Sequence, residues 1–118
     1  MVAMNEMEQV LNNNSTFFVR QNGVLQKLDW QEIYYIHADG NYCYLHTANK
    51  KFAVKISMRK LYERLEAFGF ARVHKSYIVQ SYYIDHIDTN NNSLNLGEVE
   101  IPIGRAFKKD LLDKVDIL

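Results

Sequence analysis

Five turn signals divide this chain into short segments, and they constrain its fold more than any other feature of the sequence. They are Asn22-Gly23, Asp39-Gly40-Asn41, Asn49-Lys50, Asn90-Asn91-Asn92 and Gly97-Glu98. Glycine and asparagine tolerate the left-handed backbone conformation that tight turns require. The segments between the turns are rich in aromatic residues, which favour strands. The pattern predicts a mostly β (α+β) domain with about eight short strands and two helices.

Residues 42–47 are the clearest strand, because their side chains alternate between two faces. Further strands are expected near residues 17–19, 24–28, 33–37, 52–54, 71–73, 84–88, 93–96 and 99–101. Asn22-Gly23 is a strong signal for a two-residue hairpin between the first two of these strands.

Two segments have the periodicity of helices. Ser57 is placed to cap a helix over residues 58–68, and Gly69 is placed to end it. The apolar residues of this segment are Met58, Leu61, Leu65 and Phe68. Their spacing of three and four puts them on one helical face, which predicts a core-facing stripe. A second amphipathic helix is expected over residues 107–115.

The 118 residues are enough for one domain that folds without a disulfide or a metal. Residues 1–15 have no apolar period and end in four polar residues, so we expect a linker or disordered tail before a domain at 16–118. Cys43 is the single cysteine and cannot form an internal disulfide. The chain has no apolar run long enough for a membrane helix, and its start lacks the basic residues of a signal peptide. We therefore expect a cytoplasmic protein.

The charge of the chain is unevenly distributed. The net charge is zero, but residues 50–75 contain eight basic and two acidic residues. The segments on either side, 1–49 and 76–118, each carry a net charge of −3. Local field steers a polyanion to a surface, so the basic block is compatible with a nucleic-acid partner. A solvated helix face and hairpin rim is the simpler explanation of the same block.

Motifs of common catalytic and cofactor sites do not occur in the sequence. There is no glycine-rich phosphate loop, no H-E-x-x-H and no C-x-x-C. The four histidines are His37, His46, His74 and His86. They are dispersed along the chain, whereas zinc ligands usually keep local spacing. We expect no metal, no cofactor and no enzymatic activity.

Three segments, taken in order, carry a family resemblance. Residues 33–42 (IYYIHADGNY) are similar to I-x-Y-I-E-A-x-G-N-Y, residues 70–80 (FARVHKSYIVQ) to F-x-R-v-H-[RKN]-S-[YF]-[IL]-V-N, and residues 101–108 (IPIGRAFK) to I-P-[IV]-[SG]-R-x-[YF]-[KR]. These are the patterns of the LytTR family of bacterial DNA-binding domains. The segment 56–65 also matches the helix of that family, and the resemblance covers roughly residues 16–116.

The resemblance implies a fold of about ten short antiparallel strands with one or two helices. It also implies binding of double-stranded DNA by two loop regions that enter successive major grooves. Members of the family bind direct repeats, often as side-by-side dimers or pairs, and most are output domains joined to an N-terminal receiver domain. This chain carries no receiver domain, so we expect either the output part of a longer response regulator or a free-standing regulator.

Two positions depart from the family pattern. His37 stands where the family usually has glutamate, which removes any ion pair that this glutamate would make at the strand end. Gln80 stands where the family usually has asparagine, and its side chain is one methylene longer. A turn-capping role at that position would be weakened by the extra length.

The resemblance assigns base contacts to Lys75 and Arg105. A lysine can donate to guanine or to a phosphate, and a guanidinium at a helix start can reach a base edge with two hydrogen bonds. Asn41 and Tyr42 correspond to the other loop of the family that enters a groove. The alternative for the two basic residues is an ordinary solvated surface position, and Tyr42 could equally be a packed strand residue.

Arg72, Ser76 and Lys108 are predicted to contact phosphates, which positions a protein on DNA without specifying sequence. For each, an ordinary surface position is an equal alternative. His74 is expected to be structural, because a ring nitrogen can hold a loop backbone. The main rival to DNA binding is a β-rich module for protein interaction or dimerisation.

Overall fold

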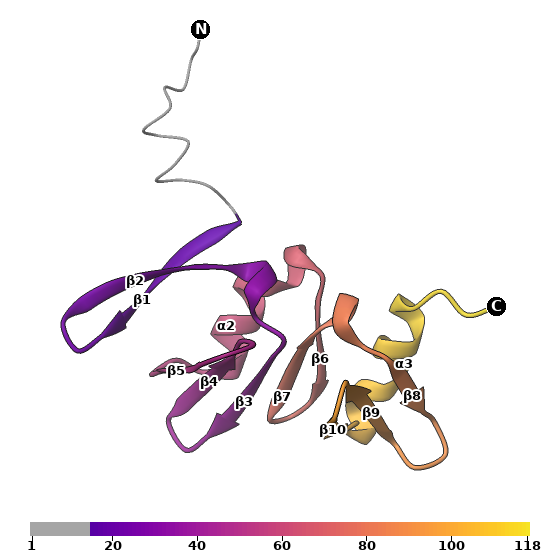
Figure 1. The fold of residues 1–118 in the computed structure, drawn as a ribbon. Helices are drawn as coiled ribbons and strands as arrows, with labels where there is room; N and C mark the ends of the chain where they lie inside the picture. The colour runs from indigo at the N-terminus through magenta and orange to yellow at the C-terminus, as the bar shows by residue number, and fades with distance from the viewer. Residues whose placement is uncertain (1–14) are drawn as a thin grey trace, which may run out of the picture.

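The computed structural model describes residues 15–118, and over this range it contains ten strands and two α-helices (Figure 1). The strands are β1 (Thr16–Gln21), β2 (Val24–Asp29), β3 (Tyr35–Asp39), β4 (Tyr42–His46), β5 (Lys51–Val54), β6 (Phe70–His74), β7 (Tyr77–Gln80), β8 (His86–Asp88), β9 (Ser93–Leu96) and β10 (Val99–Pro102). The helices are α2 (Met58–Leu65) and α3 (Arg105–Lys114). The expected tail at residues 1–15 lies outside the described residues, apart from Ser15. The mostly β class is confirmed.

The strands pair antiparallel throughout and form three sheets. The largest has the order β5-β4-β3-β7-β6, the second has the order β10-β9-β8, and β1 pairs only with β2. In the centre of the large sheet, Ile36 on β3 lies opposite Leu45 on β4 and Ile78 on β7. All three side chains are fully buried, so the register of the sheet is fixed by its apolar face.

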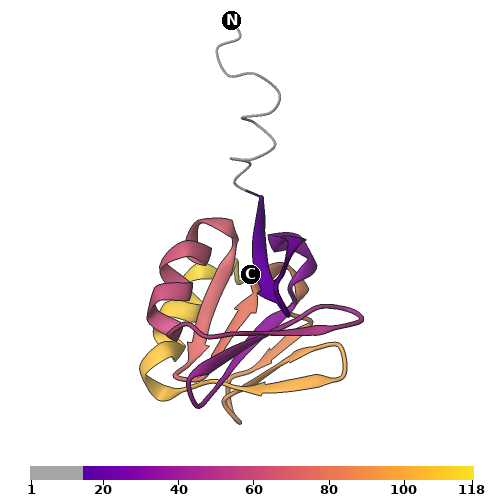
Figure 2. The ribbon, with the colours of Figure 1, turned by 90° about the vertical axis from the view of Figure 1, so that its left-hand side faces the viewer.

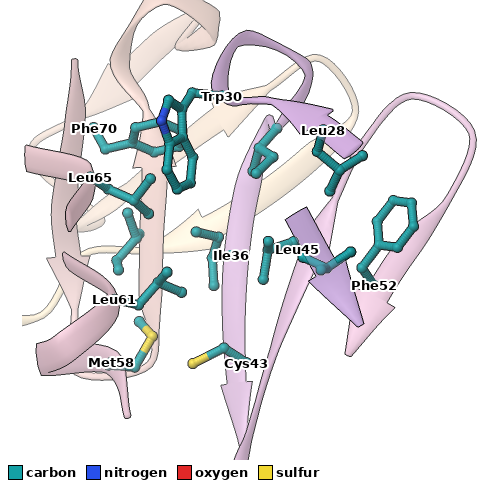
Figure 3. Close-up of a cluster of buried hydrophobic side chains, with 13 residues drawn as sticks. Leu28, Trp30, Ile36, Cys43, Leu45, Phe52, Met58, Leu61, Leu65 and Phe70 are labelled. Carbon is teal, nitrogen blue, oxygen red and sulfur yellow. The ribbon is translucent and has the colours of Figure 1, made fainter. Parts of the chain in front are cut away.

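A first core lies between the large sheet, α2 and the β1–β2 hairpin (Figure 3). The apolar face of α2 contributes Met58, Leu61 and Leu65, as its spacing predicts. Figure 3 shows Met58 and Cys43 at one end of this cluster and Leu65 beside Trp30 at the other. The start of α2 therefore lies at the end of the sheet where β3 turns into β4.

A second core lies between β6, β7, the three-stranded sheet and α3. Its buried residues are Ala71, Val73, Val79, Leu94, Leu96, Ile101, Ile103 and Leu111. Leu111 is the fully buried residue of α3, and burial of such a side chain contributes about 1.5–3 kcal/mol. Figure 2 shows α2 and α3 along the same side of the strands. The two cores meet at β6 and β7, whose residues face both.

Most local signals in the sequence are confirmed. The Ser57 hydroxyl accepts from the amide of Lys60 at 3.2 Å and caps α2. Gly69 ends the helical segment with a φ of 85°, after a single 3-10 turn at Glu66–Phe68. Asn22 and Gly23 turn the first hairpin with φ of 52° and 81°.

Several boundaries differ from the sequence expectation. Strand β7 was not among the expected strands, because Ile78, Val79 and Gln80 are all buried and show no alternation. The strand expected at 33–37 begins two residues later, since a 3-10 turn at Trp30–Glu32 precedes it. Helix α3 begins at Arg105, two residues before the expected start.

Candidate nucleic-acid interface

The three segments that carry the sequence motifs meet at one edge of the fold. The β3–β4 turn and the β6–β7 turn lie at the lower edge of Figure 1, and so does the start of α3. The amide of Ala38, near the end of β3, donates to the carbonyl of Ser76 at 2.9 Å. The amide of Gly104, directly before α3, donates to the carbonyl of Val73 at 2.7 Å. Backbone hydrogen bonds therefore hold the β6–β7 turn between the other two segments.

The β6–β7 turn has an internal framework that presents Lys75. The register of β6 and β7 shifts between Arg72 and His74, which marks a bulge before the turn. The amide of Ser76 donates to Nδ1 of His74 at 3.0 Å, which confirms the structural role expected of this histidine. Lys75 itself is exposed at the tip, and its ammonium has no ion pair within residues 15–118. The turn thus fixes its backbone and leaves one cation facing solvent.

Arg72 lies behind this turn and points into the fold. Its Nη2 donates to the carbonyl of Lys75 at 2.8 Å, and its guanidinium carbon lies 5.2 Å from the centroid of the Phe107 ring. Its Nε is buried and makes no hydrogen bond. These contacts join the β6–β7 turn to α3. To contact a phosphate, the Arg72 side chain would have to give up contacts that connect the turn to the helix.

Arg105 is the first residue of α3 and is exposed. Gly104 precedes the helix without a side-chain cap, so amides of the first turn remain open to a ligand. A Cβ at Gly104 would lie 3.1 Å from the Phe107 ring and 3.4 Å from the Cα of His74. The close approach of α3 to the β6–β7 turn therefore depends on a glycine, and it brings Arg105 next to the turn that carries Lys75.

Lys108 is bonded within the fold and is not an ordinary surface lysine. The side chain is half-buried, and Nζ donates to the carbonyl of Thr89 at 2.8 Å and to Oδ1 of Asn92 at 2.7 Å. Both acceptors belong to the β8–β9 turn. Hydrogen bonds from Asn91 and Asn90 within the same turn lower the pKa of Asp88 below its usual range. Lys108 is thus a link between α3 and this turn, and a phosphate contact by it stays a prediction.

The β3–β4 turn presents Asn41 and Tyr42 to solvent. Gly40 has a φ of 61°, a conformation that favours glycine, and allows the tight turn. Asn41 is exposed, and 43% of the Tyr42 surface is accessible, so Tyr42 is not a packed strand residue. Five of the seven predicted contact residues therefore lie at one edge, and their side chains make no hydrogen bond or ion pair within residues 15–118: Asn41, Tyr42, Lys75, Ser76 and Arg105.

Lys55 and Lys60 lie beside this edge, although the sequence did not single them out. Both belong to the basic block between residues 50 and 75, which was the signal available in the sequence. They line a groove beside Asn41 and Tyr42. Only the fold shows which lysines of the block face this edge.

At position 37, where the sequence departs from the family pattern, the histidine makes a ring contact. His37 stacks on Tyr77 with centroids 4.6 Å apart and an interplanar angle of 12°. Tyr77 begins β7, directly after the turn that holds Lys75. The stacked side chains therefore connect β3 to the end of the β6–β7 turn. They add to the backbone hydrogen bond from Ala38 to Ser76.

At position 80 the longer amide is accommodated. Gln80 is buried, and in one amide orientation its nitrogen lies 3.4 Å from the carbonyl of Trp30. In the other orientation it donates to the carbonyls of Phe68 and Gly69 at 3.3 and 3.2 Å. In both orientations Gln80 holds a neighbouring chain segment, far from the edge described above.

Cys43 is a buried thiol that the fold holds in place. Burial raises the pKa of the Cys43 thiol, whose Sγ donates to the carbonyl of Ile56 at 3.2 Å, against a smaller opposing effect of Arg72. No group of three or more potential metal ligands occurs within residues 15–118. In the same part of the chain, no helix is long and apolar enough to cross a membrane.

Known proteins resemble this chain along most of its length. The sequence model of the LytTr DNA-binding domain family matches residues 24–116. The transcriptional regulatory protein LytR of Staphylococcus aureus is 24% identical over 123 residues, covering 97% of this chain and 50% of that protein. The heme-containing CO-sensing transcriptional regulator RcoM 1 of Paraburkholderia xenovorans is 26% identical over 104 residues, covering 84% of this chain and 39% of that protein. The chain thus spans half or less of the length of these relatives.

A solved structure has the same fold. It is the LytTr DNA-binding domain of a putative methyl-accepting/DNA response regulator from Bacillus cereus. The two superpose with a TM-score of 0.73 at 18% identity, covering 84% of this chain and 94% of that one. The ten-stranded arrangement implied by the sequence motifs is confirmed at the level of the fold.

Proposed function

The chain belongs to the LytTr DNA-binding domain family, and on that basis we propose that it binds specific sequences of double-stranded DNA through one edge of the fold. This edge consists of the β3–β4 turn, the β6–β7 turn and the start of α3. The proposed activity is binding, with no catalytic step.

One observation carries the proposal: the hydrogen bonds of Ala38 to Ser76 and of Gly104 to Val73 gather three sequence-distant motifs at a single edge. The exposed cations of this edge, Lys75 and Arg105, have no ion pair within the described residues. The start of α3 lies there, and the start of α2 lines a groove together with Asn41 and Tyr42. The amino-terminal end of each helix carries a partial positive charge. An edge of this kind attracts a polyanion although the net charge of the chain is zero.

We assign different roles to the residues of this edge. Arg105 and Lys75 are proposed to contact bases, because each projects from a rigid support into solvent. Asn41 and Tyr42 enter the adjacent groove from the β3–β4 turn. Ser76 contacts a phosphate.

Arg72 and Lys108 are the remaining two proposed DNA-binding residues, and we propose that their main role is to support the edge. They hold the β6–β7 turn and α3 in place through contacts within the fold. Any phosphate contact they make is secondary to that support.

The larger biological role is part of the same proposal. The relatives named above are transcriptional regulators, and this chain corresponds to half or less of each. We propose that it acts in the cytoplasm as the output domain of a bacterial transcriptional regulator. Binding of direct repeats by a side-by-side pair, and control by a receiver domain in a longer parent chain, belong to this proposal as well.

A salt titration tests DNA binding directly. Duplexes are selected from a random pool, and the affinity of the domain is measured from about 50 to 200 mM salt. A complex with six or more phosphate contacts should weaken by about a thousandfold or more over that range. Affinity that stays flat, or that is absent for every selected duplex, would contradict the proposal.

A protein-interaction role is the second candidate, and one observation favours it. The β1–β2 hairpin exposes three large apolar side chains, Phe18, Val24 and Leu25. Phe18 and Leu25 share the outer face of the hairpin with Lys27 and Arg20. An apolar interface formed there would depend little on salt, so the titration separates the two candidates.

A further inference from the structure

A groove of about 570 Å³ adjoins the β3–β4 turn on the side of α2. Asn41 and Tyr42 form its rim on the turn, and Cys43 and Met58 lie along it. Lys55 and Lys60 line it from the segment that leads into α2 and from the first turn of the helix. The groove is thus continuous with the proposed DNA-binding edge. It lies directly beside Asn41 and Tyr42, the residues proposed to enter the major groove of the duplex.

The charge of this groove is entirely positive. Its lining contains two lysines and no acidic residue. Asp39 is the nearest acid in sequence, but it follows Ala38 on β3 and so points to the opposite face of the sheet. The groove therefore offers an anion two ammonium groups without a competing carboxylate.

Several basic residues of the fold have partners within the described residues, and the two lysines of the groove do not. Arg59 pairs with Glu63, Lys109 pairs with Asp113, and Lys114 donates to the hydroxyl of Tyr62. Lys55 and Lys60 are exposed, and within the described residues neither ammonium has an ion pair or a hydrogen bond to the protein. Their charge is available to a ligand at no loss of an internal contact.

We propose that this groove binds a backbone phosphate of the duplex, on the flank of the bases approached by Asn41 and Tyr42. The inference rests on the proposed function and adds Lys55 and Lys60 as residues that position the domain on DNA. An ammonium group is a flexible point charge that binds phosphate without selecting a base. The partial positive charge at the start of α2 adds to the field in the groove.

The double variant Lys55→Gln/Lys60→Gln tests the inference. Each lost phosphate contact lowers the slope of log affinity against log salt by about 0.9, so loss of the one phosphate in the groove should lower the slope by about 1. The relative affinity for different duplex sequences should stay unchanged, because phosphate contacts carry no sequence information. Both lysines are exposed, so their replacement should change the melting temperature little. A thermal melt checks that the variant remains folded.

The matched control is Lys27→Gln/Lys50→Gln. These lysines are equally exposed, but they lie on β2 and in the β4–β5 turn, at the end of β4 that is remote from Asn41. The control removes the same net charge and should leave the slope nearly as in the wild type. Equal slopes in the two double variants would show a general charge effect and overturn the groove assignment.

Phosphate substitution locates the contact. Single phosphates of the selected duplex are replaced by uncharged methylphosphonates, one position at a time. A flanking position should be found whose neutralisation weakens the wild type about tenfold but leaves the double variant almost unaffected. If no position behaves this way while the wild type binds with steep salt dependence, the groove inference fails and the proposed function stands. If the wild type binds no duplex, both fail.

Discussion

Arg105 is the side chain whose position best distinguishes base reading from phosphate binding. It is exposed at the first position of α3, and the backbone before it is held against the β6–β7 turn by Gly104. We expect Arg105→Ala to cost about 1–3 kcal/mol on the preferred site and to relax the preference at one base position. Affinity for preferred and unrelated duplexes at two salt concentrations measures both effects.

Lys109→Ala is the control for this prediction. Lys109 lies one turn further along α3, is exposed and pairs only with Asp113. Its replacement removes the same charge and should leave the base preference intact. If Arg105→Ala weakens preferred and unrelated duplexes equally, Arg105 is a phosphate contact and base reading must be assigned to Lys75 and the β3–β4 turn.

The sequence predicted the role of a single residue correctly where that role depends on neighbours in the chain. Ser57 and Gly69 were identified correctly, because a helix cap and a helix end are formed by neighbours in the chain. For Lys108 and Arg72, the sequence did not reveal the contacts that the structure shows within the fold. Their partners, the β8–β9 turn and Phe107, are far away in sequence, and no local pattern announces such contacts.

The same reasoning applies to the elements. Hairpins and α2 were predictable because alternation, a two-residue turn and a stripe at helical spacing are local patterns. Strand β7 was not, since it lies between β3 and β6 and is buried on both faces, which removes the alternation. Its position nevertheless bears on the proposed site, because β7 follows the turn that carries Lys75 and pairs with β3, which leads into the turn that carries Asn41.

The sheet face opposite α2 makes the stability of the fold sensitive to acid. On that face His46 stacks on Tyr35 with centroids 4.2 Å apart. Burial lowers the pKa of His46 below its usual value near 6.5, and Lys51 and His37 lower it further. Folding therefore favours the neutral imidazole. Its stabilising contribution is present above about pH 6.5 and is lost as the pH falls through the lower pKa of the folded state.

We expect His46→Gln to flatten this part of the pH dependence. Glutamine does not titrate, so the decrease in melting temperature between about pH 7.5 and 5 should be smaller in the variant. The variant should be less stable than the wild type at pH 7.5, since the ring contact with Tyr35 is lost. All other titrating groups are common to both proteins, so parallel curves would show that His46 plays no part in the acid response.

At the scale of the whole molecule, the distribution of exposed apolar side chains bears on assembly. The described surface exposes Phe18, Val24 and Leu25 on one hairpin, with Tyr42, Tyr82, Val99, Ile117 and Leu118 elsewhere. A stable dimer usually buries about 800 Å² on each partner around an apolar centre. A single short hairpin whose outer face also carries Lys27 and Arg20 is small for that purpose.

We therefore predict that the domain is monomeric at micromolar concentration and that two copies assemble on DNA carrying two binding sites. On such a duplex the second copy binds at high local concentration, so a weak hairpin contact is sufficient to favour the pair. Sedimentation of the domain alone, with a one-site duplex and with a two-site duplex, measures this. Sites spaced by a whole helical turn, about 10–11 base pairs, should favour the pair, and insertion of half a turn should abolish that preference by placing the copies on opposite faces. A stable dimer in the absence of DNA would contradict the prediction. If replacing Phe18 and Leu25 by serine then dissociated that dimer, the hairpin would be assigned to protein interaction.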